Sequence, residues 1–307
     1  METGLKLRLI SSLIMAPIAI WLIVVLPTPY FAIVLGLFFI AGAWEWAALV
    51  STPWPYIKQA YTVSVVILMV VAWFSLGVSP HFIDAVAIVA AGWWALVLLL
   101  VLTYPESAKL WNRALVKALA GFMILVPAWL CMVSLHGSGT SGPYYALYLF
   151  MMIWLADTAA YFSGRFFGKH KLAPKVSPGK SWEGVIGALT AVLIYAVIAS
   201  YFLGIFKLGT GIAFLYIAIS LFSVLVSVLG DLAESMFKRQ AHLKDSGTLF
   251  PGHGGVLDRF DSLTAAAPCF LLCYWWFSGF SVVVLDADHN LAQIGKQATS
   301  YMEELAP

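Results

Sequence analysis

FIDAVAIVAAGWWALVLLLVLT, residues 82–103, contains one acidic residue, Asp84, and no basic residue. A helix of about 20 apolar residues is long enough to cross the hydrocarbon core of a bilayer. This stretch therefore predicts a transmembrane helix, and the rest of the chain can be compared with it.

The same pattern recurs along the chain. We find nine apolar stretches of this kind, and the first two are separated by a tight Pro27–Pro29 turn. They cover residues 7–26, 29–50, 60–78, 82–103, 114–135, 143–163, 184–206, 211–233 and 262–285. The first stretch is too long for a cleavable signal peptide, and no small-residue cleavage site follows it.

The composition excludes a soluble globular domain. Of the 307 residues, 62% are hydrophobic and 10% are charged, whereas soluble domains carry about 25% charged residues. The three cysteines do not form a disulfide framework, and we expect Cys269 and Cys273 to be reduced packing residues.

The basic residues predict the orientation, because cytoplasmic loops are enriched in lysine and arginine. With the N-terminus in the cytoplasm, all basic residues except Lys207 and Lys296 fall on the cytoplasmic side. We therefore expect an all-α polytopic membrane protein with about nine transmembrane helices, a cytoplasmic N-terminus and a C-terminus outside.

Three regions are expected along this chain. Residues 1–110 hold the N-terminal transmembrane helices, and residues 286–307 form a polar C-terminal tail. Residues 111–285 form a second transmembrane domain, with unusually long cytoplasmic loops at 164–183 and 234–261. The chemistry is expected in these two loops.

The segment from Gly230 to Ser262 concentrates charge and glycine in a chain that is otherwise poor in charge. Asp231 and Glu234 share one face of a helix end, and Asp258 and Asp261 repeat that spacing. Charge within a membrane protein is expensive and marks function by default. A solvated charged loop would explain Glu234, but not an aspartate at the end of an apolar helix.

Two acidic helix ends can hold a divalent cation, and Mg²⁺ is the usual choice when phosphates complete the shell. Basic side chains would face the phosphate oxygens, and glycines let backbone amides approach an anion. The basic candidates are Lys238, Arg239, Lys244 and Arg259, and the glycines are Gly252, Gly254 and Gly255. His253 has no second histidine or cysteine at zinc-ligand spacing; a phosphate contact and a structural hydrogen bond both remain open.

A second group of candidates surrounds the 164–183 loop. Asp157 and Tyr161 lie four residues apart on one helix face. The residues from Ser177 to Lys180 predict a Pro-Gly turn that projects the lysine, and Ser181 can cap the next helix. An orientation signal or a contact with anionic lipid is the alternative for this basic run.

Two further acidic residues are weaker candidates. Glu45 lies between two tryptophans near the cytoplasmic end of the second stretch, and Asp84 lies near the outer face. We expect both to be interfacial residues.

The loop pattern also resembles a known family. From Ser235 to Asp261 the chain reads S-x-F-K-R-x4-K-D-x-G-x3-P-G-H-G-G-V-x-D-R-F-D. This pattern resembles the signature of the phosphatidate cytidylyltransferases, or CDP-diacylglycerol synthases. The 157–168 and 177–184 blocks are similar to the same family, with Gly179 where lysine is common and Ser181 where threonine is usual.

The resemblance implies that CTP and phosphatidic acid give CDP-diacylglycerol and pyrophosphate. It implies a homodimer that depends on Mg²⁺, with K⁺ as a candidate second cation. Asp231, Asp258 and Asp261 would be the metal residues. The other catalytic candidates are Lys238, Arg239, Lys244 and Arg259, and the substrate-binding candidates are Ser177, Lys180, Ser181, Asp157, Tyr161, His253, Gly254 and Gly255.

The expected location is the inner (plasma) membrane, with the active site on the cytoplasmic side and no nucleic-acid partner. There, a lipid phosphate and a water-soluble nucleotide can both reach the site. Two other functions compete with this one. A CTP-dependent polyprenol or lipid kinase would need a base and would attack the γ-phosphorus, and an anion or lipid transporter would place its charges near the bilayer midplane.

Overall fold

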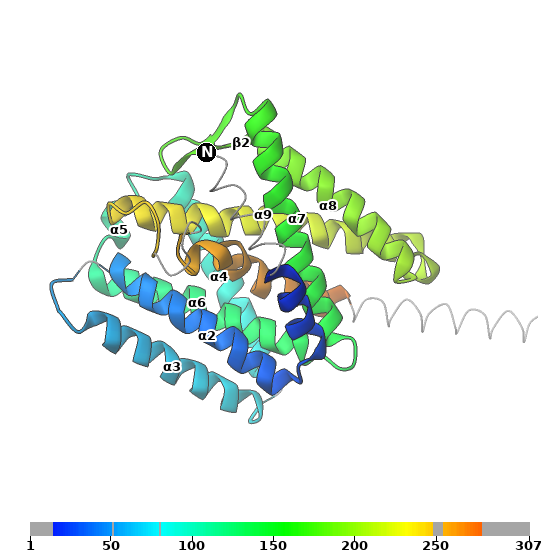
Figure 1. Cartoon of the computed structure of the whole chain (residues 1–307), viewed down its shortest axis with the longest axis horizontal. Coiled ribbons are helices and arrows are strands. Elements are labelled where there is room, and N and C mark those ends of the chain that lie inside the picture. Colours follow the sequence, from blue (N-terminus) through cyan, green and yellow to red (C-terminus); the bar gives the residue numbers. More distant parts are fainter. Residues whose placement is uncertain (1–14, 51, 80, 248–253, 278–307) are drawn as a thin grey trace, which may run out of the picture.

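The computed structural model describes residues 15–50, 52–79, 81–247 and 254–277. Seven helices in this part of the chain are long and apolar enough to cross a membrane (Figure 1). They are α2 (Thr28–Leu49), α3 (Ile57–Leu76), α4 (Phe82–Leu102), α6 (Ala114–His136), α7 (Gly142–Phe167), α8 (Trp182–Phe202) and α9 (Thr210–Gln240). The predicted class, an all-α polytopic membrane protein, is confirmed.

The first and last predicted spans lie partly outside the described residues. Their described parts are a short apolar helix, Met15–Val25, and a helix over residues 257–277. The remaining elements are short: α5 (Ala108–Trp111), the 3-10 helix η1 (Ile205–Leu208), and strands β1 (Lys171–Ala173) and β2 (Ser177–Ser181). The total of nine spans therefore stays a prediction.

The second long loop is shorter than its predicted 234–261 bounds. Helix α9 continues to Gln240, and the next helix begins at residue 257. The hydropathy pattern ends at Glu234, but Ala233, Met236 and Phe237 continue an apolar stripe at helical spacing, and all three are buried. Packing on this stripe extends the helix into the charged segment.

The predicted Pro-Gly turn at 177–180 is wrong, because these residues form strand β2. The strand pairs antiparallel with β1, with Lys171 opposite Ser181. The turn lies earlier in the chain, at residues 173–176, where the Val176 amide donates to the Ala173 carbonyl at 3.1 Å. Pro174 is the second residue of that turn, a position that suits its fixed φ angle. Pro178 is tolerated in β2 because a two-stranded sheet consists of edge strands.

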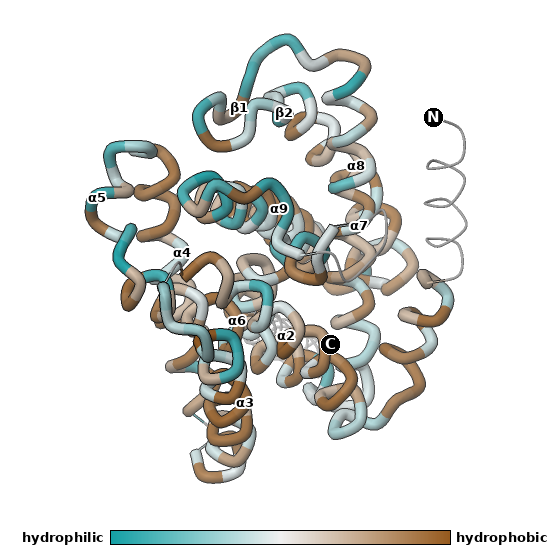
Figure 2. Tube along the Cα trace, turned by 60° about the vertical axis from the view of Figure 1, so that its left-hand side comes forward, coloured by the Kyte–Doolittle hydropathy of each residue, from teal (hydrophilic) through white to brown (hydrophobic). Residues whose placement is uncertain are grey.

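Close helix contacts surround the polar end of the molecule. Helix α9 packs against α4, α7 and α8, and it crosses between the α7–α8 pair and the group of α2, α3 and α6 (Figure 1). Figure 2 shows hydrophilic stretches on the hairpin, near α5 and along α9, whereas α3 is mostly hydrophobic. The charged segments of the two long loops therefore come together on one side of the helices.

Gly230 marks the closest approach of α9 to the last helix. A Cβ at this position would collide with the carbonyl oxygen of Asp261 and would crowd Ala265 at 3.1 Å. The glycine thus allows two helices that carry acidic residues to touch backbone to backbone.

We expect Gly230→Ala to lower the thermal unfolding midpoint of the purified protein. Overpacking of this kind costs about 1–3 kcal/mol, which exceeds the gain of about 1 kcal/mol in helix propensity. Gly211→Ala is the matched control, because it lies in the same helix and its Cβ would meet nothing within 4 Å. Equal midpoints for the two variants would contradict the close contact.

Candidate active site

A cavity of about 1130 Å³ opens at the polar end of the helices. Its walls come from α7, the hairpin, α9 and the start of the last helix, which are far apart in the sequence. Most of the predicted site residues line it: Asp157, Tyr161, Lys180, Ser181, Asp231, Lys238, Lys244, Gly254, Asp258, Arg259 and Asp261. The fold thus brings both predicted groups of candidates to one place.

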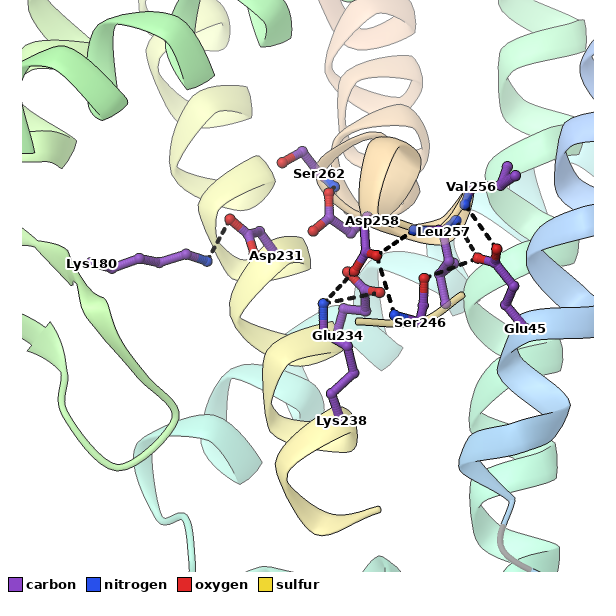
Figure 3. Close-up of polar contacts among 12 residues, drawn as sticks. Glu45, Lys180, Asp231, Glu234, Lys238, Ser246, Val256, Leu257, Asp258 and Ser262 are labelled. Carbon is purple, nitrogen blue, oxygen red and sulfur yellow. Dashed lines mark hydrogen bonds and ion pairs between the residues drawn. The ribbon is translucent and has the colours of Figure 1, made fainter. Parts of the chain in front are cut away.

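Lys180 joins the hairpin to α9. Its Nζ lies 2.6 Å from Oδ2 of Asp231, and Figure 3 shows the lysine reaching across from the hairpin side. The lysine side chain is 22% exposed and the aspartate side chain is 36% exposed. The ammonium nitrogen of Lys180 is itself shielded from solvent, so Asp231 is the more accessible partner of this pair.

Lys238 joins α9 to the last helix. Its Nζ lies 2.5 Å from Oδ1 of Asp258 and 3.3 Å from Oε1 of Glu234. Because Glu234 is only 3% exposed and lies inside α9, its interpretation as a solvated loop charge is wrong. The spacing of four residues between Glu234 and Lys238 could have indicated this pair.

Asp258 is held by backbone donors as well. Its Oδ2 accepts hydrogen bonds from the Ser246 amide at 3.2 Å and from the Gly255 amide at 2.8 Å. Asp261 is 9% exposed, and its Oδ1 accepts from the Ser262 amide at 2.6 Å. Both aspartates therefore have fixed positions at the cavity wall.

The α7–α8 side of the cavity contains polar contacts of its own. The Arg165 guanidinium donates to the Tyr161 hydroxyl at 2.9 Å. Ser181 caps α8 as predicted, because its Oγ accepts from the Gly184 amide at 3.2 Å. No pattern in the sequence pairs His170 with Glu183. In the structure, Nδ1 of His170 lies 2.7 Å from Oε1 of Glu183, and this contact helps to hold the hairpin against α8.

Three predicted site residues do not line the cavity. Arg239 donates from Nε to the Val176 carbonyl at 3.3 Å and so ties α9 to the hairpin turn. Ser177 is part of the paired strand β2. Gly255 lies behind the cavity wall, where an added Cβ would collide with Ser246. The predictions for Gly252 and His253 lie outside the described residues.

The two weaker acidic candidates, Asp84 and Glu45, differ in their burial. Asp84 is exposed, and its Oδ2 lies 3.4 Å from Nδ1 of His81, in agreement with an interfacial position. Glu45 is 7% exposed and accepts three hydrogen bonds from residues 246–257. The prediction that Glu45 is an interfacial residue is therefore wrong, and only its contacts in the folded chain show this.

The donor set fits a divalent cation that also binds phosphate. Among the described residues, no three acidic, histidine or cysteine side chains are grouped as a complete metal cage. Mg²⁺ does not need one, since it is usually held by one or two carboxylates together with phosphate and water. Asp231, Asp258 and Asp261 line the same cavity, and lysine ammonium groups already balance the first two.

Carboxylates and cations around one cavity at the end of apolar helices define a membrane enzyme that acts on phosphate groups. Residues 6–277 match the model of the cytidylyltransferase family. The chain is 41% identical over 285 residues to a phosphatidate cytidylyltransferase of Haemophilus influenzae, covering 89% of this chain and 99% of the relative. It is 43% identical over 271 residues to that of Pseudomonas aeruginosa, covering 88% and 97%. The chain belongs to the cytidylyltransferase family, as the loop pattern predicted.

We expect Lys238→Met to destabilise the protein more than Lys180→Met. The first change leaves two carboxylates of 3% and 13% exposure without their cation, which costs about 3–5 kcal/mol for a buried pair. The second change leaves one carboxylate, Asp231, whose side chain is 36% exposed and can be solvated by water, so the loss should be smaller. Thermal unfolding of both variants in the same detergent checks the order, and equal losses would contradict the burial of the Lys238 cluster.

Proposed function

We propose that this chain transfers the cytidylyl group of CTP to phosphatidic acid, giving CDP-diacylglycerol and pyrophosphate. The observation that carries the proposal is the single cavity in which acidic and basic residues of both loops meet at the polar end of membrane helices. Family membership supports it, as do relatives named phosphatidate cytidylyltransferase that match almost over their full length.

The cavity chemistry suits this reaction. The phosphate of phosphatidic acid is already a nucleophile, so its attack on the α-phosphorus of CTP needs no strong base. Such a transfer depends on in-line positioning and on neutralising the charge of the departing pyrophosphate. Five cationic side chains of the described residues line the cavity and can serve that purpose: Arg165, Lys180, Lys238, Lys244 and Arg259.

Mg²⁺ is the proposed cofactor, held by Asp231 and Asp258 with Asp261 close by. When bound, the cation neutralises phosphate charge and orients the nucleotide. Lys180 and Lys238, which pair with two of these aspartates, are then free to bind phosphate oxygens. K⁺ is proposed as a second cation, and its support is the family resemblance alone.

The proposed setting is the bacterial inner membrane, with nine spans, a cytoplasmic N-terminus and the cavity on the cytoplasmic side. The distribution of lysine and arginine supports this orientation. A homodimer is proposed from the family resemblance. Within this setting, CTP enters from water and phosphatidic acid enters from the leaflet.

Labelled CTP distinguishes this function from the two alternatives. We expect purified protein in phosphatidic acid micelles to place a cytidine label, and no γ-phosphate label, on the lipid. A γ-phosphate on an added polyprenol would instead identify a lipid kinase. Substrate movement across vesicles without CTP turnover would identify a transporter.

We expect Asp258→Asn to lower turnover by about 100-fold or more, as removal of a key charge at a reacting centre does. The protein should stay folded in the membrane, because the asparagine oxygen can still accept from a backbone amide. Asp84→Asn is the control, since it removes the same charge at an exposed position outside the cavity lining. Normal turnover in Asp258→Asn would refute the metal assignment.

A further inference from the structure

Glu45 of α2 makes the longest-range polar contacts of the site region. Its two carboxylate oxygens accept from the Ser246 hydroxyl at 2.9 Å, the Val256 amide at 3.0 Å and the Leu257 amide at 2.9 Å. Figure 3 shows these bonds converging on Glu45 from the segment beside Asp258. A buried acid of the N-terminal helices thus binds the segment that carries the candidate metal residues.

These bonds fix the start of the last helix. The first amides of any helix lack partners within the helix, and a negative charge is favourable there. Val256 and Leu257 immediately precede Asp258, and Asp261 follows one turn later. The Glu45 carboxylate therefore sets where this helix begins and which way its first turn faces.

The same carboxylate holds both ends of the glycine-rich segment. Ser246 lies before it and Val256 after it, and both bind Glu45. The fit is close, because a Cβ on Gly247 or on Gly255 would collide with the Glu45 side chain or with Ser246. Two glycines of the family-like pattern are therefore explained by the space that Glu45 occupies.

We propose that Glu45 is a positioning residue for the transfer reaction, which holds Asp258 and Asp261 at the cavity wall through the backbone of residues 256–257. The inference rests on the proposed function. Glu45 itself is not among the described residues that line the cavity, so we expect it to act without touching the substrate. Its contribution is the alignment of groups that do.

The test uses Glu45→Gln in the purified full-length protein. The amide keeps the size of the side chain, but its NH₂ group cannot accept from a backbone amide. We expect kcat to fall about 10- to 100-fold, the range for residues that orient metal ligands. The KM for phosphatidic acid should stay within about twofold, because Glu45 contacts no substrate. Hydrogen exchange of the 256–257 amides should become faster.

Glu106→Gln is the matched control, because this side chain is 70% exposed and its Oε1 lies 3.8 Å from Nζ of Lys175, which is also exposed. It should leave kcat and amide exchange unchanged. Ser246→Ala is the milder second variant if Glu45→Gln folds poorly, and it should lower kcat about threefold, in line with the loss of one hydrogen bond.

Three outcomes would overturn the proposal. A kcat of Glu45→Gln within twofold of the wild type would do so, even if the unfolding midpoint falls, because Glu45 would then serve stability only. Unchanged exchange of the 256–257 amides would exclude the contact itself. A wild-type protein that forms no CDP-diacylglycerol would refute the proposed function and, with it, the role of Glu45. This outcome is distinguishable from the other two, because it is measured on the wild type and not on a variant.

Discussion

The site depends on one constraint: a carboxylate that leaves water must receive donors or a cation in exchange. Three buried or half-buried acids meet it in different ways. Glu45 accepts hydrogen bonds from a hydroxyl and two backbone amides. Asp258 accepts from the Lys238 ammonium and from two amides. Glu234 has only the charge of Lys238 at 3.3 Å, because its oxygens have no hydrogen-bond partner among the described residues. Each acid therefore fixes the segment that supplies its donors, and together they fix the geometry of the cavity wall.

This constraint also explains the helix packing around the cavity. Lys238 can reach Asp258 only if α9 and the last helix lie close together, and Gly230 permits that approach. The apolar stripe that extends α9 to Gln240 also places Lys238 in the final turns of the helix, within reach of Asp258. On the opposite wall, Lys180 depends on the hairpin, which Arg239 and Glu183 hold in place.

Hydropathy and charge placement predicted much of this structure. Seven of the expected spans appear as long apolar helices, and acids in an apolar context identified Asp231 and Asp258 as cavity residues. The hairpin was missed because the segment contains two prolines that suit a turn, Pro174 and Pro178. Only the pairing of β1 with β2 shows that the turn is at Pro174. Glu45 was missed because its partners lie 201 to 212 residues away, and no local pattern encodes such a contact.

The composition of the cavity also agrees with the reaction it is proposed to perform. In the described part of the lining, no histidine or cysteine is present, and acidic and basic side chains occur in equal number. A phosphate nucleophile needs little proton transfer, whereas the charge on pyrophosphate and on two phosphate substrates must be balanced. Lys180 and Lys238 pair with Asp231 and Asp258, so opposite charges are already balanced on the cavity wall. Under the proposed function, a metal–nucleotide complex would take the place of both ion pairs, and the positions of Asp231 and Asp258 would then decide how well it fits.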